Sequence, residues 1–439
     1  MDKPEKIKKN RHLRWLRLDN AAKIYPAARR EDWSNVFRVS ASLTEPVDVS
    51  VLEQALEIMV ERFPSIAARL RKGMFWYYLQ QLEHPPAIRE EYSYPLVKMS
   101  KAEVRRCALR VIVYRNRIAL EFFHSLTDGN GAMVFLKNLL AEYLERKYNI
   151  SVPFEQGIVD RHQPPAEEEL EDSFQKYAGS RHASRQSDTA WHLTGSPEPD
   201  GFRHITCFQL PVEKSLEKAH EYGISLTAFL CAVMMEALQR LQAEKIPDRR
   251  WRPPIKVFLP VNLRRLFPSK TLRNFILYTI PEIQPRLGSY TFPEICKVVH
   301  HCMGSEVTAK QMSMMIATNL SSERILAVRI LPLFIKNLVM KAVFNSVGEK
   351  KSCLSFSNLG AVKLPENMAP YVTRLDFILG VQATAPYNCG IVSWKDTVYI
   401  NFIRDTRESE LEYRFFQVLQ EHGIPVLVES NGGNDTCTV

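Results

Sequence analysis

The sequence lacks any apolar run long enough to cross a bilayer. Its longest run, from Leu226 to Met235, ends at Glu236, whereas a membrane-spanning helix needs about 20 predominantly apolar residues. The Lys-rich start is followed by no apolar segment, so no secretory signal is predicted. The 8 cysteines are scattered and form no C-x-x-C pair. This pattern favours reduced thiols in a cytoplasmic protein over a disulfide framework.

Several catalytic and binding motifs are also missing. No Gly-x-Ser-x-Gly turn is present to carry a serine nucleophile, and no nucleic-acid-binding module is recognised. Cys296 and His300 lie four residues apart on a predicted helix. The adjacent His301 cannot share their face, however, and no carboxylate completes a ligand set. We therefore predict neither a metal site nor binding to nucleic acid.

In other respects the composition is that of an ordinary globular protein, but its positive charge is unevenly distributed along the chain. Hydrophobic residues make up 45% of the chain, charged residues make up 24%, and the net charge is +9. Residues 1–30 hold ten Lys or Arg against Asp2, Glu5 and Asp19. Such a cluster can attract a polyanion, a membrane surface or the phosphates of a ligand, although a solvated basic face is the simpler interpretation.

A second basic stretch, from Ser322 to Asn345, is strongly apolar and is interrupted by Pro332. Its cations Arg329, Lys336 and Lys341 make a membrane-spanning helix energetically unfavourable here. The stretch could lie on a bilayer, line an apolar tunnel, or pack in the core with its cations at the surface. Peripheral contact with a membrane therefore stays open.

One histidine stands at the end of a predicted strand and is followed at once by a predicted helix. Residues 117–123 alternate in the period of two that is typical of a strand, and residues 132–144 carry apolar side chains at helical spacing. Between them lie His124, Asp128 and Gly129. A tight turn here would point His124 into a cleft and Asp128 back into the fold. The plainer alternative is a strand-end histidine with Asp128 acting only as a helix cap.

The rest of the chain predicts two comparable mixed α/β halves without a fixed-period repeat. A helix opens at Asp48, and a hairpin around residues 115–116 leads to His124. From Pro153 to about Asp200, the Pro-rich, acidic and then Ser- and Arg-rich sequence predicts an exposed crossover. The second half contains an apolar helix over residues 226–241. The predicted strands are 35–43, 74–79, 107–114, 117–123, 204–210, 255–259, 354–358, 372–381 and 425–429, with a hairpin over 390–404.

Two of the predicted helices start with the Ser-x-x-Glu spacing of a capping box. Ser50 and Glu53 mark the helix that opens at Asp48, and Ser409 and Glu412 mark the last helix of the chain. In a capping box the two side chains satisfy free N–H groups of the first turn. Both pairs are expected to do so here.

Three segments resemble a known superfamily. Residues 123–129 (Phe-His-Ser-Leu-Thr-Asp-Gly) resemble the His-His-x-x-x-Asp-Gly signature of the chloramphenicol acetyltransferase-like superfamily. Residues 260–264 (Pro-Val-Asn-Leu-Arg) resemble its Pro-x-x-x-Arg segment, and residues 355–360 resemble the segment that crosses between its subdomains. The likeness runs from about Leu13 to Ser430 and points to the alcohol acetyltransferase branch, whose relatives include plant BAHD acyltransferases and condensation domains. Phe123 replaces the first histidine, which weakens assignment to condensation domains more than it weakens catalysis.

The resemblance implies an α/β (α+β) fold of two chloramphenicol acetyltransferase-like subdomains. Each is expected to be a mixed, mostly antiparallel sheet with helices, and the two are expected to form a pseudo-dimer with a tunnel at their interface. The expected bounds are an N-terminal subdomain at 1–152, a crossover linker at 153–200, a C-terminal subdomain at 201–430 and a flexible tail at 431–439.

The resemblance also implies an acyltransferase that uses a thioester donor, acyl-CoA or carrier-bound, and an alcohol or amine acceptor, with no bound cofactor. A neutral imidazole can remove the acceptor proton near pH 7, so His124 is expected to be the general base. Asp128 is expected to hold the loop through an ion pair with Arg264 or another arginine. The backbone N–H near Gly129 and the side chains of Ser357 or Asn358 are candidates for binding the oxyanion.

Two rival interpretations remain at this point. The first is a binding or carrier-docking relative that has lost turnover, against which the intact His124, Asp128 and Gly129 weigh. The second is amide-forming condensation on carrier-bound substrates, which the absence of an attached carrier domain disfavours. Neither the acyl chain length nor the acceptor follows from the sequence.

Overall fold

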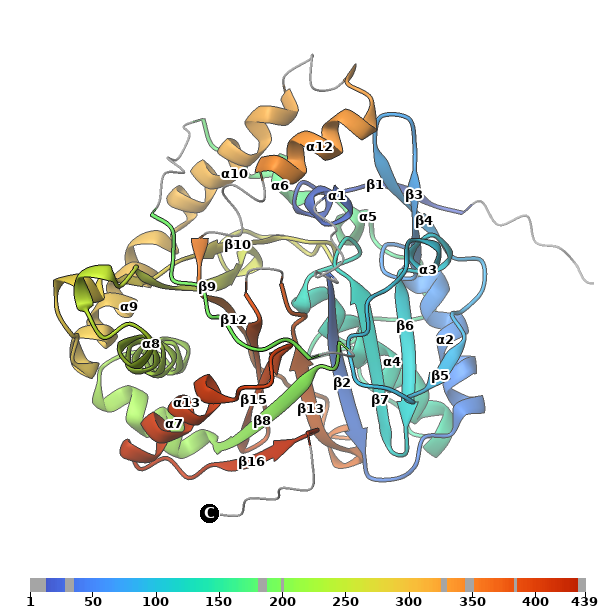
Figure 1. Ribbon diagram of the computed structural model, residues 1–439. Coiled ribbons are helices and arrows are strands. Elements are labelled where there is room, and N and C mark those ends of the chain that lie inside the picture. Colours follow the sequence, from blue (N-terminus) through green and yellow to red (C-terminus); the bar gives the residue numbers. More distant parts are fainter. Residues whose placement is uncertain are drawn as a thin grey trace, which may run out of the picture.

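The computed structural model describes residues 13–27, 35–180, 188–198, 201–324, 330–343, 351–382 and 385–432 (Figure 1). Most of the basic residues at the start of the chain lie outside these ranges. Parts of the apolar, basic stretch 322–345 and most of the predicted tail lie outside them as well.

The sheet that carries His124 has five strands in the order β13-β2-β7-β6-β5. The central strand, β7, pairs antiparallel with both β2 and β6, so that Phe123 lies opposite Val36. Helix α4 packs against both α2 and β2, and it follows β7 directly in the chain. The elements are β2 (Val36–Leu43), α2 (Val49–Arg62), β5 (Ile88–Glu90), β6 (Leu109–Tyr114), β7 (Arg117–Phe123), α4 (Gly129–Tyr148) and β13 (Val372–Ile378).

The second large sheet has eight strands, seven of them in the order β10-β9-β12-β14-β15-β8-β16, while β11 pairs with β9. Helix α8 packs against α7, α9, α13 and β9. The elements are β8 (His204–Pro211), α7 (Val212–Glu221), α8 (Leu226–Lys245), β9 (Ile255–Asn262), β10 (Ile276–Thr279), β11 (Glu282–Ile283), α9 (Phe292–Glu306), β12 (Leu354–Ala361), β14 (Tyr387–Trp394), β15 (Thr397–Arg404), α13 (Glu410–Glu421) and β16 (Leu427–Ser430).

Strand β13 joins the two sheets. It comes from the second half of the chain, between β12 and β14 of the eight-stranded sheet, yet it pairs with β2 of the five-stranded sheet. Figure 1 shows it at the seam of the two sheets. The approach is close, because a Cβ atom on Gly390 of β14 would lie 2.3 Å from the carbonyl oxygen of Phe377. Residues 355–360 belong to β12 and stay within the eight-stranded sheet, so the strand that crosses is β13.

A smaller sheet of three strands, in the order β1-β4-β3, lies at the top of Figure 1 close to α1 and α12. Of its strands, the sequence predicted only β4, and it placed that strand about three residues too early. The elements of this region are β1 (Trp15–Arg17), η1 (Ala21–Lys23), α1 (Ile24–Ala27), β3 (Ala68–Lys72), β4 (Tyr77–Gln81), α10 (Ala309–Arg324) and α12 (Leu333–Val343).

The crossover is less exposed than its composition predicted. Phe174 is buried in a cluster with Phe275, and Trp191 and Leu193 are buried in the core beneath the eight-stranded sheet. Arg161 is buried in an ion pair with Glu142 of α4. A few buried apolar and charged side chains thus pack the crossover against α4 and against the core of the second half, although most of its residues are polar.

The predicted capping boxes do not form. Asp48, not Ser50, is the N-cap of α2, and its carboxylate accepts from the backbone N–H groups of Ser50 and Val51. Ser409 makes no side-chain cap at α13. Glu412 is instead buried, neither of its carboxylate oxygens has a hydrogen-bond partner, and burial raises its pKa to about 7. Spacing alone does not identify the capping residue when a better acceptor or a buried face competes for the position.

No single helix within the described ranges is both long and apolar enough to span a membrane. The pair α7 and α8, which is bent by 81°, has the required length and composition when taken together. Most residues of α8 are buried in the core of the fold.

Candidate active site

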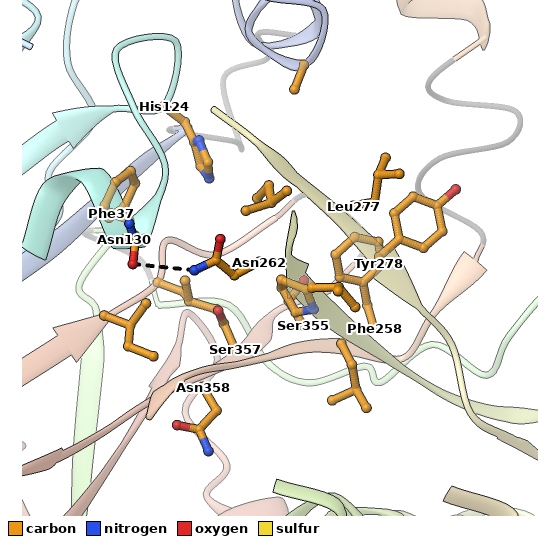
Figure 2. A pocket seen from close by; sticks show the side chains of 18 of the residues that line it. Phe37, His124, Asn130, Phe258, Asn262, Leu277, Tyr278, Ser355, Ser357 and Asn358 are labelled. Carbon is orange, nitrogen blue, oxygen red and sulfur yellow. Dashed lines mark hydrogen bonds between the residues drawn. The ribbon is translucent and has the colours of Figure 1, made fainter. Parts of the chain in front are cut away.

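His124 lies directly after β7, where the chain turns towards α4. Its backbone N–H donates to the carbonyl oxygen of Asn35, with an N–O distance of 2.9 Å. Its ring stacks on Tyr25, with centroids 4.3 Å apart and planes 14° apart, and it contacts Phe37 at 4.9 Å. Figure 2 shows the ring pointing into a cavity. The aromatic neighbours therefore hold the imidazole in one plane and leave one edge facing the cavity.

Asn274 fixes which nitrogen of His124 carries the proton. The Asn274 amide nitrogen donates to the His124 carbonyl oxygen at 3.0 Å and to the Asp19 carboxylate at 3.4 Å. The Asn274 side-chain oxygen must then face His124 Nδ1, which lies 3.1 Å away. Since this oxygen can only accept, Nδ1 is the protonated nitrogen. The unprotonated Nε2 is left with its lone pair.

Burial lowers the pKa of His124. Desolvation disfavours the imidazolium and outweighs the nearby Asp128 carboxylate, which acts in the opposite direction. The ring is therefore neutral at pH 7, the form that accepts a proton. Burial also raises the pKa of Asp19, the carboxyl behind Asn274, to about 6.

Asp128 faces away from the cavity and is completely buried. One carboxylate oxygen accepts from the Gly131 backbone N–H at 3.0 Å and so caps α4. The other accepts from Arg264 Nη1 at 2.8 Å and from the Phe275 backbone N–H at 2.9 Å. Arg264 is itself fixed by donation to the Thr271 carbonyl oxygen at 2.8 Å. The ion pair expected between Asp128 and Arg264 is therefore present, and it ties α4 to the segment before β10.

Two glycines allow the chain to pack tightly at the start of α4. A Cβ atom on Gly131 would lie 2.1 Å from Thr127 Oγ1 and 2.3 Å from the Leu272 carbonyl oxygen, so no other residue fits there. A Cβ atom on Gly129 would lie 2.8 Å from a methyl group of Leu359. Gly129 lines the cavity, at the helix end where backbone N–H groups are free of helical partners.

The cavity has a volume of about 1130 Å³ and lies between elements of both sheets. Ser357 lines it, and Asn358 lies below Ser357 in Figure 2. The Asn358 side chain is engaged, because it donates to Thr227 Oγ1 at 3.0 Å and accepts from the Gly360 N–H at 2.7 Å. Ser357 is thus the freer of the two predicted oxyanion candidates. Other lining residues labelled in Figure 2 are Phe37, Asn130, Phe258, Asn262, Leu277, Tyr278 and Ser355.

The charged side chains of the cavity wall are all of one sign. Among the described residues that line it, six are Lys or Arg and none is Asp or Glu. Burial lowers the pKa of one of them, Lys137, to about 8. Such a wall attracts an anionic group and repels a cationic one. The six are Lys23, Lys137, Arg265, Lys336, Lys351 and Lys363.

The sequence missed several residues that shape this site. Asn274 and Asp19 approach His124 from distant parts of the chain, and Tyr25 and Asn35 precede the motif by about ninety residues or more. No local pattern marks these contacts. Gly131 did carry a signal, because a second glycine two residues after Gly129 is costly in a helix unless the space requires it.

Known family models give no match to this chain, and no curated protein matches it significantly. Solved structures do resemble it. Polyketide synthase associated protein 5 from Mycobacterium tuberculosis is 14% identical with a TM-score of 0.60, covering 92% of this chain and 97% of that one. The first condensation domain of the calcium-dependent antibiotic synthetase, in complex with a substrate analogue, is 12% identical with a TM-score of 0.61, covering 94% and 99%.

A third solved structure, F. sporotrichioides TRI101 complexed with coenzyme A and T-2, is 11% identical with a TM-score of 0.63, covering 94% of this chain and 99% of that one. Identities this low establish the fold and leave the reaction open. The alignments span nearly the whole of each chain, so the likeness covers both sheets and not one half alone. The chain therefore has the two-subdomain α/β fold that condensation domains share with chloramphenicol acetyltransferase-like acyltransferases.

Proposed function

We propose that this protein is an acyltransferase that moves an acyl group from a thioester to an alcohol or amine, with His124 as general base. The observation that carries the proposal is the state of His124: its ring is neutral, Nδ1 is held by Asn274, and the remaining nitrogen faces a cavity between the two sheets. A base in this position can reach an acceptor and a donor that enter the same cavity.

In the proposed reaction His124 Nε2 takes the proton of the acceptor as its oxygen or nitrogen attacks the thioester carbonyl carbon. The C–S bond then breaks, and the imidazolium returns the proton to the departing thiolate. The negative charge on the carbonyl oxygen needs a donor, for which the backbone N–H of Gly129 and the Ser357 hydroxyl are the candidates. Within the described ranges, no serine or cysteine side chain bonds to His124, which supports direct transfer without an acyl-enzyme.

The charge of the cavity supports a donor that carries phosphate, either acyl-CoA or a phosphopantetheine-linked carrier. The six cations on its wall, with no carboxylate among the described lining residues, would attract such a group. The alcohol acetyltransferase assignment, a cytoplasmic location and the subdomain bounds 1–152 and 201–430 form part of the same proposal, with β13 of the second subdomain paired to the sheet of the first.

The test is a screen of the purified protein with acyl-CoAs of several chain lengths against alcohols and amines. We expect release of free thiol that depends on the acceptor. Release only from carrier-bound donors, with an amide product, would favour condensation chemistry instead. If no donor loses its thiol under any condition while the protein binds acyl-CoA, the protein is a binding relative and the proposal is wrong.

Asn274 provides a second test, because its side-chain oxygen contacts Nδ1 of His124, the ring nitrogen that does not face the cavity. It is buried and does not line the cavity. Replacing Asn274 by alanine removes the acceptor at Nδ1, so the imidazole can place its proton on either nitrogen. We expect kcat to fall by at least about tenfold, as when other catalytic histidines lose the partner that fixes their tautomer, while KM changes little.

A matched control is Asn401→Ala, since Asn401 is equally buried but bonds to Asp376 at the seam. This variant should lose stability without a specific loss of kcat. A rise in KM with unchanged kcat in Asn274→Ala would show that Asn274 acts on substrate binding and not on the state of His124.

A further inference from the structure

Helix α12 carries an unusual number of apolar side chains on its outer face. Phe334, Leu338 and Val339 are 62%, 67% and 54% exposed, and the preceding Ile330 is 66% exposed. Within α12, Phe334 and Leu338 are four residues apart and so lie on one face, with Val339 next to Leu338, while Ile330 precedes the break at Pro332. Exposed apolar side chains scattered singly are normal, but a contiguous group of this kind marks an interaction surface.

The tip of the β3–β4 hairpin extends this face. Met74 is 75% exposed, and its carbonyl oxygen accepts from the Leu333 N–H at 3.1 Å. Lys336 donates to the Phe75 carbonyl oxygen at 3.0 Å, and its Nζ lies 3.4 Å from the centroid of the Trp76 ring. We call the combined surface the apolar rim, defined as Met74, Phe75, Trp76, Ile330, Phe334, Leu338 and Val339.

The charge next to the apolar rim is mostly positive. The elements that carry the rim or border it (β1, η1, α1, the β3–β4 hairpin and α12) contain cations but no Asp or Glu, whereas α10, beside α12 in Figure 1, contains Glu323, and the short helix α5 (Glu167–Leu170) is acidic. Lys72 and Lys341 are exposed among them. Apolar side chains within a basic border are the pattern of proteins that lie on anionic membranes. The cations of these elements are Arg17, Lys23, Arg69, Arg71, Lys72, Lys336 and Lys341.

The apolar rim also borders the cavity that contains His124. Trp76, Lys336 and Val339 belong to the rim or its border and line the cavity at the same time. A molecule or surface bound to the apolar rim would therefore lie next to the cavity of the candidate active site. A protein partner would fit the apolar area, but the predominantly positive charge of the elements that carry the rim favours an anionic surface.

We propose that the apolar rim docks on the surface of an anionic bilayer and presents the mouth of the cavity to the lipid. Phe334, Leu338 and Met74 enter the boundary between headgroups and acyl chains, while Lys72 and Lys341 meet the lipid phosphates. An apolar acceptor or product can then pass between membrane and cavity without crossing water. The docking itself does not rest on the proposed reaction, and its test needs no turnover.

The experiment is cosedimentation of the full-length protein with phosphatidylcholine vesicles and with mixed phosphatidylcholine–phosphatidylglycerol vesicles. We expect binding to the mixed vesicles that weakens with added salt, and little binding to phosphatidylcholine alone. The double variant Phe334→Ser/Leu338→Ser and the double variant Lys72→Glu/Lys341→Glu should each bind at least about tenfold more weakly. None of these four side chains lines the cavity.

Two control pairs separate this surface from general effects. Tyr413 and Leu427 are similarly exposed, at 55% and 51%, on α13 and β16, which lie at the opposite end of Figure 1 from α12. Tyr413→Ser/Leu427→Ser should leave vesicle binding unchanged. Arg249→Glu/Lys297→Glu alters net charge as much as the lysine variant and should have a much smaller effect.

An equal loss of vesicle binding in the control and rim variants would overturn the proposal. So would a stable dimer of the wild type that Phe334→Ser/Leu338→Ser dissociates without any vesicle binding.

Discussion

Replacing His124 by alanine should slow acceptor-dependent thiol release by roughly 10²–10⁴-fold, the usual contribution of a positioned general base. The imidazole is the neutral proton acceptor that faces the cavity, and Asn274 and Tyr25 hold it in place. KM for the donor should change much less, because the phosphate-bearing part of the donor would be bound by the cations of the wall. The measurement is steady-state turnover with the best donor and acceptor pair.

His300→Ala is a suitable control, because His300 is exposed on α9 and does not line the cavity. It should turn over as the wild type does. The melting temperature of His124→Ala should be recorded alongside, since the ring packs on Tyr25 and Phe37. Unchanged turnover in a folded His124→Ala protein would refute the mechanism.

Asp128→Asn should lower the free energy of unfolding by on the order of 3–5 kcal/mol, the range found when one partner of a buried ion pair is removed. The amide can still accept from the Gly131 N–H, but its NH₂ group would face Arg264 Nη1 and the Phe275 N–H, which are all donors. Arg264 would keep its charge without the carboxylate. Activity should fall as well, because the turn that carries His124 loses its anchor. Denaturant unfolding measures the first effect and turnover the second.

Asp48→Asn gives the matched comparison. Asp48 caps α2 as Asp128 caps α4, but it is exposed, and within the described part of the chain its carboxylate accepts hydrogen bonds from Ser50 and Val51 alone. Because asparagine and aspartate are equally good N-caps, this variant should change stability little. If Asp128→Asn abolishes activity with an unchanged melting temperature, Asp128 acts directly in the reaction and not through the fold.

The sequence predicted the local elements of this fold better than their connections. The strand before His124, the helix after it and the hairpin turns were recovered, since alternation, helical spacing and turn residues act over a few positions. Strand β3 was missed because its sequence, Ala-Arg-Leu-Arg-Lys, is short and basic. The pairing of β13 with β2 joins residues more than 300 positions apart, which no periodicity can reveal.

The same distinction holds for the site. The motif predicted where His124 and Asp128 would stand, and the ion pair to Arg264 followed from the resemblance. The contact of Asn274 with His124 spans 150 positions and depends on how the two sheets meet. Asn358 was named as an oxyanion candidate, but Thr227 and Gly360 already engage its side chain. Sequence can nominate polar residues near a site, but only packing decides which of them are free to act.

The position of β13 in the sheet of the first half has a consequence for how the protein folds. Without β13, strand β2 would be an open edge with unpaired N–H and C=O groups beside β7, a template for aggregation. The sheet that holds His124 is complete only once residues near 378 have been added, and we expect a fragment that ends before residue 372 to aggregate more readily than the full chain. Completing the sheet that carries His124 thus requires a strand from the second half of the chain, which couples the folding of the two halves.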